Sequence, residues 1–240
     1  MMELAIDTST DQASVALALE GRLLSEVTWH ASPAGGQGSR RHSATLLPQI
    51  DHLLQLQGAV IRDLGAVAVA LGPGSFNGLR TGIGTAKGLC LALDIPLIGV
   101  GTLEVAAYPF AVTGRPICPV QEAGRGELAV ALYQGTGEEG WRCLVPPQFV
   151  RAADLPVWAR SDALFCGEIG TELAHTLRQT CGPDRVLTGA AAVRRAGVLA
   201  ELAWGRLARG EVEDLDRVEP LYLRRPAISQ PRVPIRHQEA

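Results

Sequence analysis

The sequence predicts an α/β protein whose amino-terminal half forms a mixed five-stranded sheet, and three observations support this prediction. Residues 4–29 contain three short apolar segments, separated by the polar turn Thr8-Ser-Thr10 and by Glu20-Gly-Arg22, a pattern typical of an antiparallel meander. After His42 the spacing of apolar residues changes to that of a helix. Strand and helix segments then alternate as far as residue 110, so right-handed crossovers should place the later strands parallel beside the meander.

The first half contains strands and helices of ordinary length. We predict strands over residues 4–7, 14–19, 23–29, 66–71 and 97–100, and helices over residues 42–57, 80–93 and 102–110. One face of the first helix carries Leu46, Leu47, Ile50, Leu53 and Leu54. Pro48 lies inside this pattern, so the helix either bends at Pro48 or begins there.

The second half is less regular and is interpreted as a second lobe. Strands are predicted over residues 117–120, 128–133, 141–150 and 163–166, and helices over residues 169–178 and 190–209, the last closed by Gly210. We divide the chain into an amino-terminal lobe (1–110), a carboxy-terminal lobe (111–225) and a flexible tail rich in proline and arginine (226–240). The basic residues near the end either are solvated or touch RNA phosphates; they are Arg224, Arg225, Arg232 and Arg236.

Composition argues against an independent nucleic-acid-binding module. The 240 residues include 22 Lys and Arg against 25 Asp and Glu, a net charge of −3, and only 5% are aromatic. Neither an attraction to phosphates nor a stacking surface for bases is expected. Five widely spaced cysteines form no metal-binding pair and should mostly be reduced and buried. An apolar strand pattern begins at Leu4 and charged residues interrupt the longest apolar stretch, so we expect a cytoplasmic protein without a membrane span.

The strongest local pattern is the glycine-rich segment of residues 71–80, Leu-Gly-Pro-Gly-Ser-Phe-Asn-Gly-Leu-Arg. It follows a strand and opens a helix, where it either forms a tight turn or turns backbone amides toward an anion. It lacks the Gly-Lys-Ser or Gly-Lys-Thr of a phosphate-binding loop. Inside the next helix, Gly82, Gly84 and Gly88 each cost about 0.5–1 kcal/mol relative to alanine. Close approach of another helix or of the chain's own sheet would compensate for this cost.

Several segments together resemble the TsaB (YeaZ) family, which belongs to the actin-like and Hsp70-like ATPase superfold. The matching segments, spread over nearly the whole chain, are Ile6-Asp-Thr-Ser9, His42-Ser43 with Leu46-Leu-Pro48 and Ile50-Asp51, Gly72-Pro-Gly-Ser-Phe76, Gly78-Leu-Arg80, Ala86-Lys-Gly88, Ile95-Pro-Leu97, Gly99-Val100 and Pro220-Leu-Tyr-Leu-Arg224. The resemblance implies a duplicated actin-like/RNase H-like (ASKHA) fold, with two lobes that each contain a mixed sheet and flanking helices. The chain departs from the family at Ala44, at Asn77 and along Glu122–Ala129.

The resemblance also implies a function and partners. The expected role is that of a non-catalytic subunit that pairs with the related catalytic subunit TsaD, together with the ATPase TsaE, to place threonylcarbamoyl on the adenosine next to the anticodon of tRNA. The isolated protein is expected to pair with a second copy, and tRNA would be reached through the complex. No cofactor should be bound firmly, although ATP or ADP could bind at the subunit junction through the partners. The expected interface residues are His42, Leu46, Leu47, Ile50, Leu53, Leu54, Arg80, Thr81, Gly84, Thr85 and Gly88.

Two patterns bear on whether the chain is an enzyme. The metal-binding histidine pair of TsaD-like subunits corresponds here to Thr102 and Ala106, which supply no imidazole. Asp7, Thr8 and Ser9 either hold a metal-bound phosphate of a nucleotide or cap a turn, since both uses suit a carboxylate beside hydroxyls at the end of a strand. The alternative function is that of an independent ATP-dependent kinase or transferase of the same superfold. No catalytic residue and no metal ligand is predicted.

Overall fold

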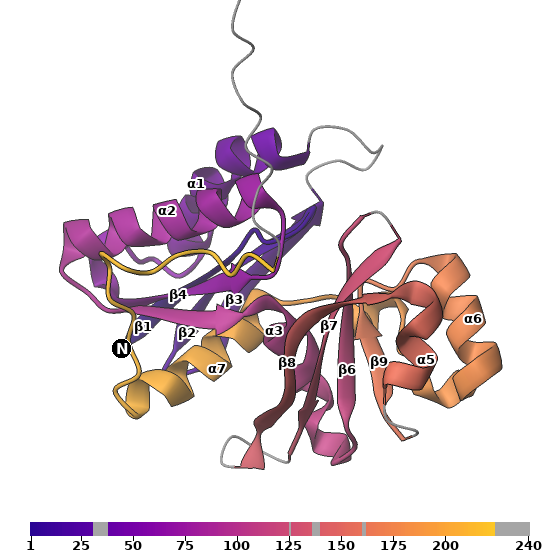
Figure 1. Ribbon diagram of the computed structural model, residues 1–240. Coiled ribbons are helices and arrows are strands. Elements are labelled where there is room, and N and C mark those ends of the chain that lie inside the picture. Colours follow the sequence, from indigo (N-terminus) through magenta and orange to yellow (C-terminus); the bar gives the residue numbers. More distant parts are fainter. Residues whose placement is uncertain (31–37, 125, 136–139, 160–161, 224–240) are drawn as a thin grey trace, which may run out of the picture.

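A computed structural model describes residues 1–30, 38–124, 126–135, 140–159 and 162–223 of the chain. Within them the chain forms two mixed sheets, each with helices against its faces, and the two lie side by side (Figure 1). The tail beyond residue 223, with the four arginines considered above, lies outside the described residues. None of the helices that the described residues form is both long and apolar enough to cross a membrane.

The first sheet is the predicted mixed, five-stranded one. Its strands are β1 (Met2–Asp7), β2 (Gln12–Leu19), β3 (Arg22–His30), β4 (Leu64–Gly72) and β5 (Leu97–Gly101), in the order β3-β2-β1-β4-β5. β1, β2 and β3 form the antiparallel meander, whereas β4 pairs parallel with both β1 and β5. The prediction from periodicity and right-handed crossovers is confirmed.

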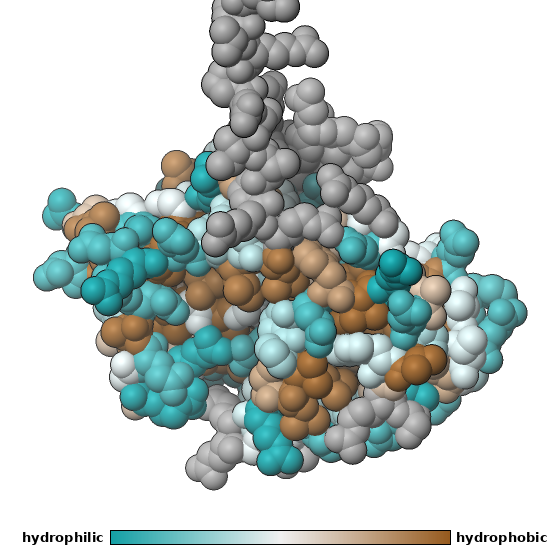
Figure 2. All heavy atoms as spheres, viewed as in Figure 1, coloured by the Kyte–Doolittle hydropathy of each residue, from teal (hydrophilic) through white to brown (hydrophobic). Residues whose placement is uncertain are grey.

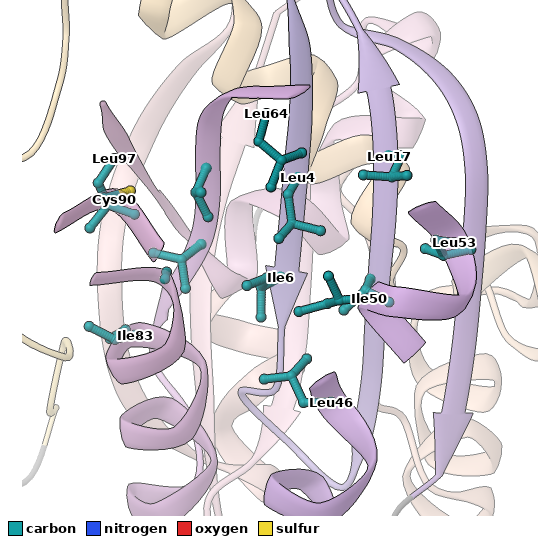
Figure 3. Packing of buried hydrophobic residues seen from close by; sticks show 14 of the residues in the cluster. Leu4, Ile6, Leu17, Leu46, Ile50, Leu53, Leu64, Ile83, Cys90 and Leu97 are labelled. Carbon is teal, nitrogen blue, oxygen red and sulfur yellow. The ribbon is translucent and has the colours of Figure 1, made fainter. Parts of the chain in front are cut away.

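Two helices, α1 (Gly38–Leu56) and α2 (Phe76–Leu93), cover one face of this sheet. α1 continues through Pro48 without a break, and α2 begins four residues earlier than predicted because Ser75 caps it, its hydroxyl accepting a hydrogen bond from the Gly78 amide at 3.3 Å. Figure 3 shows Leu46, Ile50 and Leu53 directed from α1 onto the strands. The leucine-rich face of α1 therefore belongs to the core of the chain itself.

The opposite face of the first sheet is covered by a helix from the far end of the chain. Successive residues along the strands alternate in size and point to opposite faces of the sheet. Leu, Ile or Val side chains point toward α1 and α2, and alanines such as Ala5, Ala16 and Ala68 point to the other side. Against these alanines lies α7 (Ala196–Ala208), together with α3 (Thr102–Ala107). Small side chains let a helix approach the sheet closely.

The position of α7 corrects two predictions. The helix predicted over 190–209 begins only at Ala196, and a short 3-10 turn occupies Gly189–Ala192. Its end is as expected, because Gly210 adopts a positive φ and its amide bonds the Leu207 carbonyl. The predicted lobe of residues 111–225 must also be corrected, since residues 196–208 pack on the amino-terminal sheet instead.

The second sheet forms the other lobe. Its strands are β6 (Ile117–Glu122), β7 (Glu127–Gln134), β8 (Arg142–Arg151) and β9 (Leu164–Gly167), in the order β8-β7-β6-β9. β9 pairs parallel with β6 and the other pairs are antiparallel. The helices α5 (Leu155–Trp158) and α6 (Thr171–Cys181) accompany it. All five cysteines of the chain are free, and Cys90, Cys118 and Cys166 are buried, as expected.

Residues 211–223 form an extended strap that returns along the first lobe. The amide of Glu213 bonds the Leu97 carbonyl at 2.8 Å and the amide of Leu221 bonds the Leu71 carbonyl at 2.7 Å. Val218 is buried in the core beneath α1 and α2. In Figure 1 the strap runs below α2, and in Figure 2 apolar residues gather in that part of the face. The strap therefore belongs to the amino-terminal lobe as well.

Candidate functional site

The end of β1 carries Asp7, Thr8 and Ser9, all buried. One carboxylate oxygen of Asp7 accepts hydrogen bonds from the Ser9 amide at 2.9 Å and from the Ser9 hydroxyl at 2.6 Å. The Thr8 hydroxyl donates to the Gly78 carbonyl at 2.7 Å. These bonds are the turn-capping contacts expected of such residues in the structural alternative.

The second carboxylate oxygen of Asp7 pairs with the guanidinium of Arg194, from the loop before α7. The same guanidinium donates to the Thr10 hydroxyl at 2.9 Å and to Glu168, which follows β9 in the other lobe, at 3.1 Å. Although burial alone would lower the pKa of Arg194, the charges of Asp7 and Glu168 raise it above its ordinary value. One arginine thus joins the two lobes through carboxylates of both.

Sequence reasoning missed Arg194 and Glu168 because no local pattern connects them to Asp7. Arg194 and Asp7 are 187 residues apart, and Arg194 fell inside a predicted helix. Both oxygens of Asp7 are engaged by the chain's own donors, as is the hydroxyl of Thr8. A nucleotide at Asp7, Thr8 and Ser9 would have to displace these contacts, so the geometry favours the structural alternative.

The glycine-rich turn packs α2 tightly against the end of β1. A side chain at Gly74 would collide with the Ser9 carbonyl, one at Gly78 with the Thr8 carbonyl, and one at Gly82 with the Thr8 hydroxyl. These glycines are needed for close approach, and Gly82 thereby accounts for one of the helix glycines that the sequence left unexplained. The tight-turn alternative describes this segment.

A cleft of about 500 Å³ opens between the lobes next to this turn. Its lining comes from the β1–β2 turn, the glycine-rich turn, the second sheet and the strap. The charged residues among the described lining are all acidic: Asp11, Glu122 and Glu168. Such a lining disfavours the phosphates of a nucleotide bound without a counterion.

The predicted partner interface divides into a buried part and an outer part. His42, Leu46, Ile50, Leu53 and Leu54 are at most 4% exposed. They cannot touch another subunit directly, because the four leucine and isoleucine side chains pack in the core with the strands and the His42 ring bonds the β1–β2 turn. Figure 3 shows Leu46, Ile50 and Leu53 in this arrangement. The prediction that these five side chains contact a partner is therefore corrected: they position α1.

The remaining predicted interface residues lie on the outside of α1 and α2. Leu47 is 57% exposed, and no described residue outside the helix's own backbone comes within 4 Å of a Cβ added at Gly84 or Gly88. Leu91, which the prediction omitted, is 67% exposed one turn further along. We call this surface the outer strip; it consists of Leu47, Thr81, Gly84, Thr85, Gly88 and Leu91.

Side-chain contacts of Arg80 and Thr81 lie beside the outer strip, at the start of α2. The guanidinium of Arg80 lies over the Phe76 ring, 4.0 Å from its centre. Tyr222 of the strap also packs against this ring, with the two ring centres 5.4 Å apart. The hydroxyls of Ser43 and Thr81 are 3.3 Å apart, so the outer surfaces of α1 and α2 adjoin. Arg80 therefore stays a predicted interface residue, but one already held by Phe76.

The positions that would carry a metal in TsaD-like subunits lie in α3. Thr102 is fully buried and its hydroxyl finds no hydrogen-bond partner in the described parts of the chain, while Ala106 contributes only a methyl group. Among the described residues, no three His, Cys, Asp or Glu side chains gather as a metal centre would require. The donor set at Thr102 and Ala106 does not fit a transition metal.

Two lobes that each contain a mixed sheet with flanking helices, joined at the end of the first strand, define the duplicated actin-like/RNase H-like class of proteins. The model of the family described as TsaD, tRNA N6-adenosine threonylcarbamoyltransferase, matches residues 22–158. The chain belongs to this TsaD-related family and, within it, to the TsaB (YeaZ) family.

Individual relatives support this assignment. The tRNA threonylcarbamoyladenosine biosynthesis protein TsaB of Escherichia coli is 29% identical over 93% of this chain and 95% of its own length. The same-named protein of Bacillus subtilis is 34% identical over 64% of both chains. The solved structure of YeaZ from Pseudomonas aeruginosa superposes with a TM-score of 0.72 at 27% identity, covering 92% of this chain and 99% of that one.

Proposed function

We propose that this chain acts in the biosynthesis of tRNA threonylcarbamoyladenosine as a non-catalytic subunit that pairs with a TsaD-type transferase. The relatives named TsaB support the pathway. The matching family model is that of the transferase itself, so the chain and its proposed partner share a fold. Related folds that expose equivalent helices are suited to pair through them.

The outer strip is the observation that carries this proposal. Gly84 and Gly88 lie inside α2, where each costs helix stability, yet within the described part of the chain nothing outside their own helix comes within 4 Å of a Cβ added at either position. The leucines beside them, Leu47 and Leu91, are exposed. These two glycines lower the stability of the helix without allowing a closer contact among the described residues. Their presence is explained if the helix of a partner approaches the backbone of α2 there.

The net charge of the chain and the contacts at its lobe junction favour a non-catalytic role. A net charge of −3 gives no attraction to tRNA, so tRNA is bound through the complex. Asp7 is neutralised by Arg194, which disfavours the alternative of an independent ATP-dependent kinase. ATP or ADP would accordingly enter through the partners, with TsaE as the ATPase.

The test is association with the TsaD paralogue of the same organism. Gly84→Arg adds a long charged side chain in the middle of the outer strip, so we expect loss of the heterodimer in size-exclusion chromatography while the circular dichroism spectrum stays that of the folded chain. The matched control is Gln179→Arg, which adds the same charge to an exposed position of α6 in the other lobe and should leave association intact.

Undiminished association of Gly84→Arg with TsaD would show that another surface is used. The same strip should mediate pairing of two copies when the chain is alone, because exposed apolar side chains favour self-association. We therefore expect Gly84→Arg to be monomeric at concentrations where the unaltered chain is a dimer. A buried substitution such as Ile50→Asp is unsuitable for this test, since Ile50 belongs to the core.

A further inference from the structure

Two carboxylates from different lobes contact one buried guanidinium. Asp7 stands at the end of β1 in the first sheet, and Glu168 follows β9 of the second sheet. Both contact the guanidinium of Arg194, whose side chain is only 4% exposed, while those of Asp7 and Glu168 are 1% and 33% exposed. Without a cation between them, two carboxylates at such a place would repel each other.

The guanidinium of Arg194 also donates hydrogen bonds to uncharged oxygens of the β1–β2 segment. Besides the two carboxylates, it donates to the hydroxyl of Thr10 at 2.9 Å and to the carbonyl of Gln12 at 3.3 Å. The side-chain amide of Gln12 in turn donates to the carbonyl of Arg194 at 2.6 Å. All of the acceptors around the guanidinium are oxygens. A set of carboxylate, hydroxyl and carbonyl oxygens is also what a hard divalent cation binds.

We propose that the lobe junction is a cation site that the chain fills with its own Arg194 in place of a divalent metal. Arg194 thereby holds the two lobes together without a metal or a nucleotide. Its charge and its hydrogen bonds also prevent a metal ion or a nucleotide from binding at Asp7. Arginine suits this role because its charge is permanent and its several donors can serve acceptors from two lobes at once.

The substitution Arg194→Ala tests this inference. It leaves the buried Asp7 and the partly exposed Glu168 without their shared cation, so the thermal midpoint should fall by several degrees in metal-free buffer. Added Mn²⁺ should then raise the midpoint of this variant and should appear as a bound ion by electron paramagnetic resonance. The unaltered chain should show neither effect. The control Arg194→Ala with Asp7→Asn lacks one carboxylate and should lose at least tenfold in Mn²⁺ affinity.

Three outcomes would overturn the proposal: Mn²⁺ that stabilises the unaltered chain as much as the variant, a variant that gains no Mn²⁺ binding, or equal binding in the Asp7→Asn control. If Arg194→Ala does not fold in metal-free buffer, Mn²⁺ should restore the native circular dichroism spectrum. A chain that stays unfolded at every Mn²⁺ concentration would count against the proposal in the same way.

The inference stands apart from the proposed pairing with TsaD. Arg194 lies at the lobe junction and makes its contacts with the β1–β2 segment and Glu168, whereas pairing is assigned to the outer strip of α1 and α2. The Mn²⁺ measurements need no partner protein. Failure of one proposal therefore leaves the other intact.

Discussion

His42 shows how one buried polar residue ties an element to its neighbours. It lies in the first described turns of α1, is 1% exposed, and its Nε2 donates to the Thr10 carbonyl at 2.8 Å. The edge of Trp29 packs near its ring. Burial lowers the pKa of His42 below its ordinary value, and the Thr10 carbonyl, Asp11 and Asp7 oppose this only in part.

The lowered pKa makes folding depend on pH in a defined direction. Because the unfolded chain binds the proton at an ordinary pKa of about 6.5, it binds more protons than the folded chain as pH falls through that value. We expect the free energy of unfolding to drop as the pH falls from about 7 through the unfolded pKa of about 6.5, and to level off once the lower pKa of the folded chain is passed. His42→Gln keeps a donor for Thr10 and should weaken this dependence in urea titrations.

His52→Gln is the matched control, since His52 is exposed on the same helix and should leave the pH dependence unchanged. An identical pH dependence of the unaltered chain and of His42→Gln would show that the buried histidine does not govern it.

At the scale of elements, α2 combines two kinds of glycine. Gly82 faces inward against Thr8 and Ile6, whereas Gly84 faces outward and a Cβ added there would meet none of the residues that the structure describes. Both lie in the interior of the same helix, so the intrinsic cost of each is the same. Their surroundings alone distinguish them.

This difference gives opposite expectations for one substitution. Gly84→Ala should stabilise the chain by about 0.5–1 kcal/mol at concentrations where it is a monomer, because alanine favours the helix and meets no neighbour among the described residues. Gly82→Ala should destabilise it by roughly 1–3 kcal/mol, because the added methyl collides with the Thr8 hydroxyl. Urea denaturation of the two variants side by side measures both. A destabilising Gly84→Ala under these conditions would mean that the outer strip is covered even in the monomer.

For the whole molecule, α7 packs on the first sheet and so joins an early and a late segment of the sequence in one core. Leu199 of α7 is fully buried against the alanine-lined face of the strands. The second sheet lies between these segments in the sequence, so the first lobe is built from two separate stretches of chain, whereas the strands of the second sheet form one continuous insertion. Folding of the first lobe should therefore require residues beyond 195.

Leu199→Ala is the corresponding test. Removing a fully buried leucine side chain should lower the free energy of unfolding by about 2–5 kcal/mol. Val157→Ala, at a position that is 91% exposed, should change it by less than about 0.5 kcal/mol. Chemical denaturation followed by circular dichroism compares them. Similar values for both would contradict the assignment of α7 to the core.

The sequence by itself determined the order of strands and helices in the first half, the mixed sheet and the family, because apolar periodicity and turn residues are local signals. It could not tell whether the leucines of α1 cover this chain's sheet or a partner, since both burials need the same pattern. It contained one unused clue to α7 in the alternation of alanines with larger residues along the strands. Only the tertiary structure brought Arg194 to Asp7, because contacts across 187 residues follow from packing and not from any local pattern.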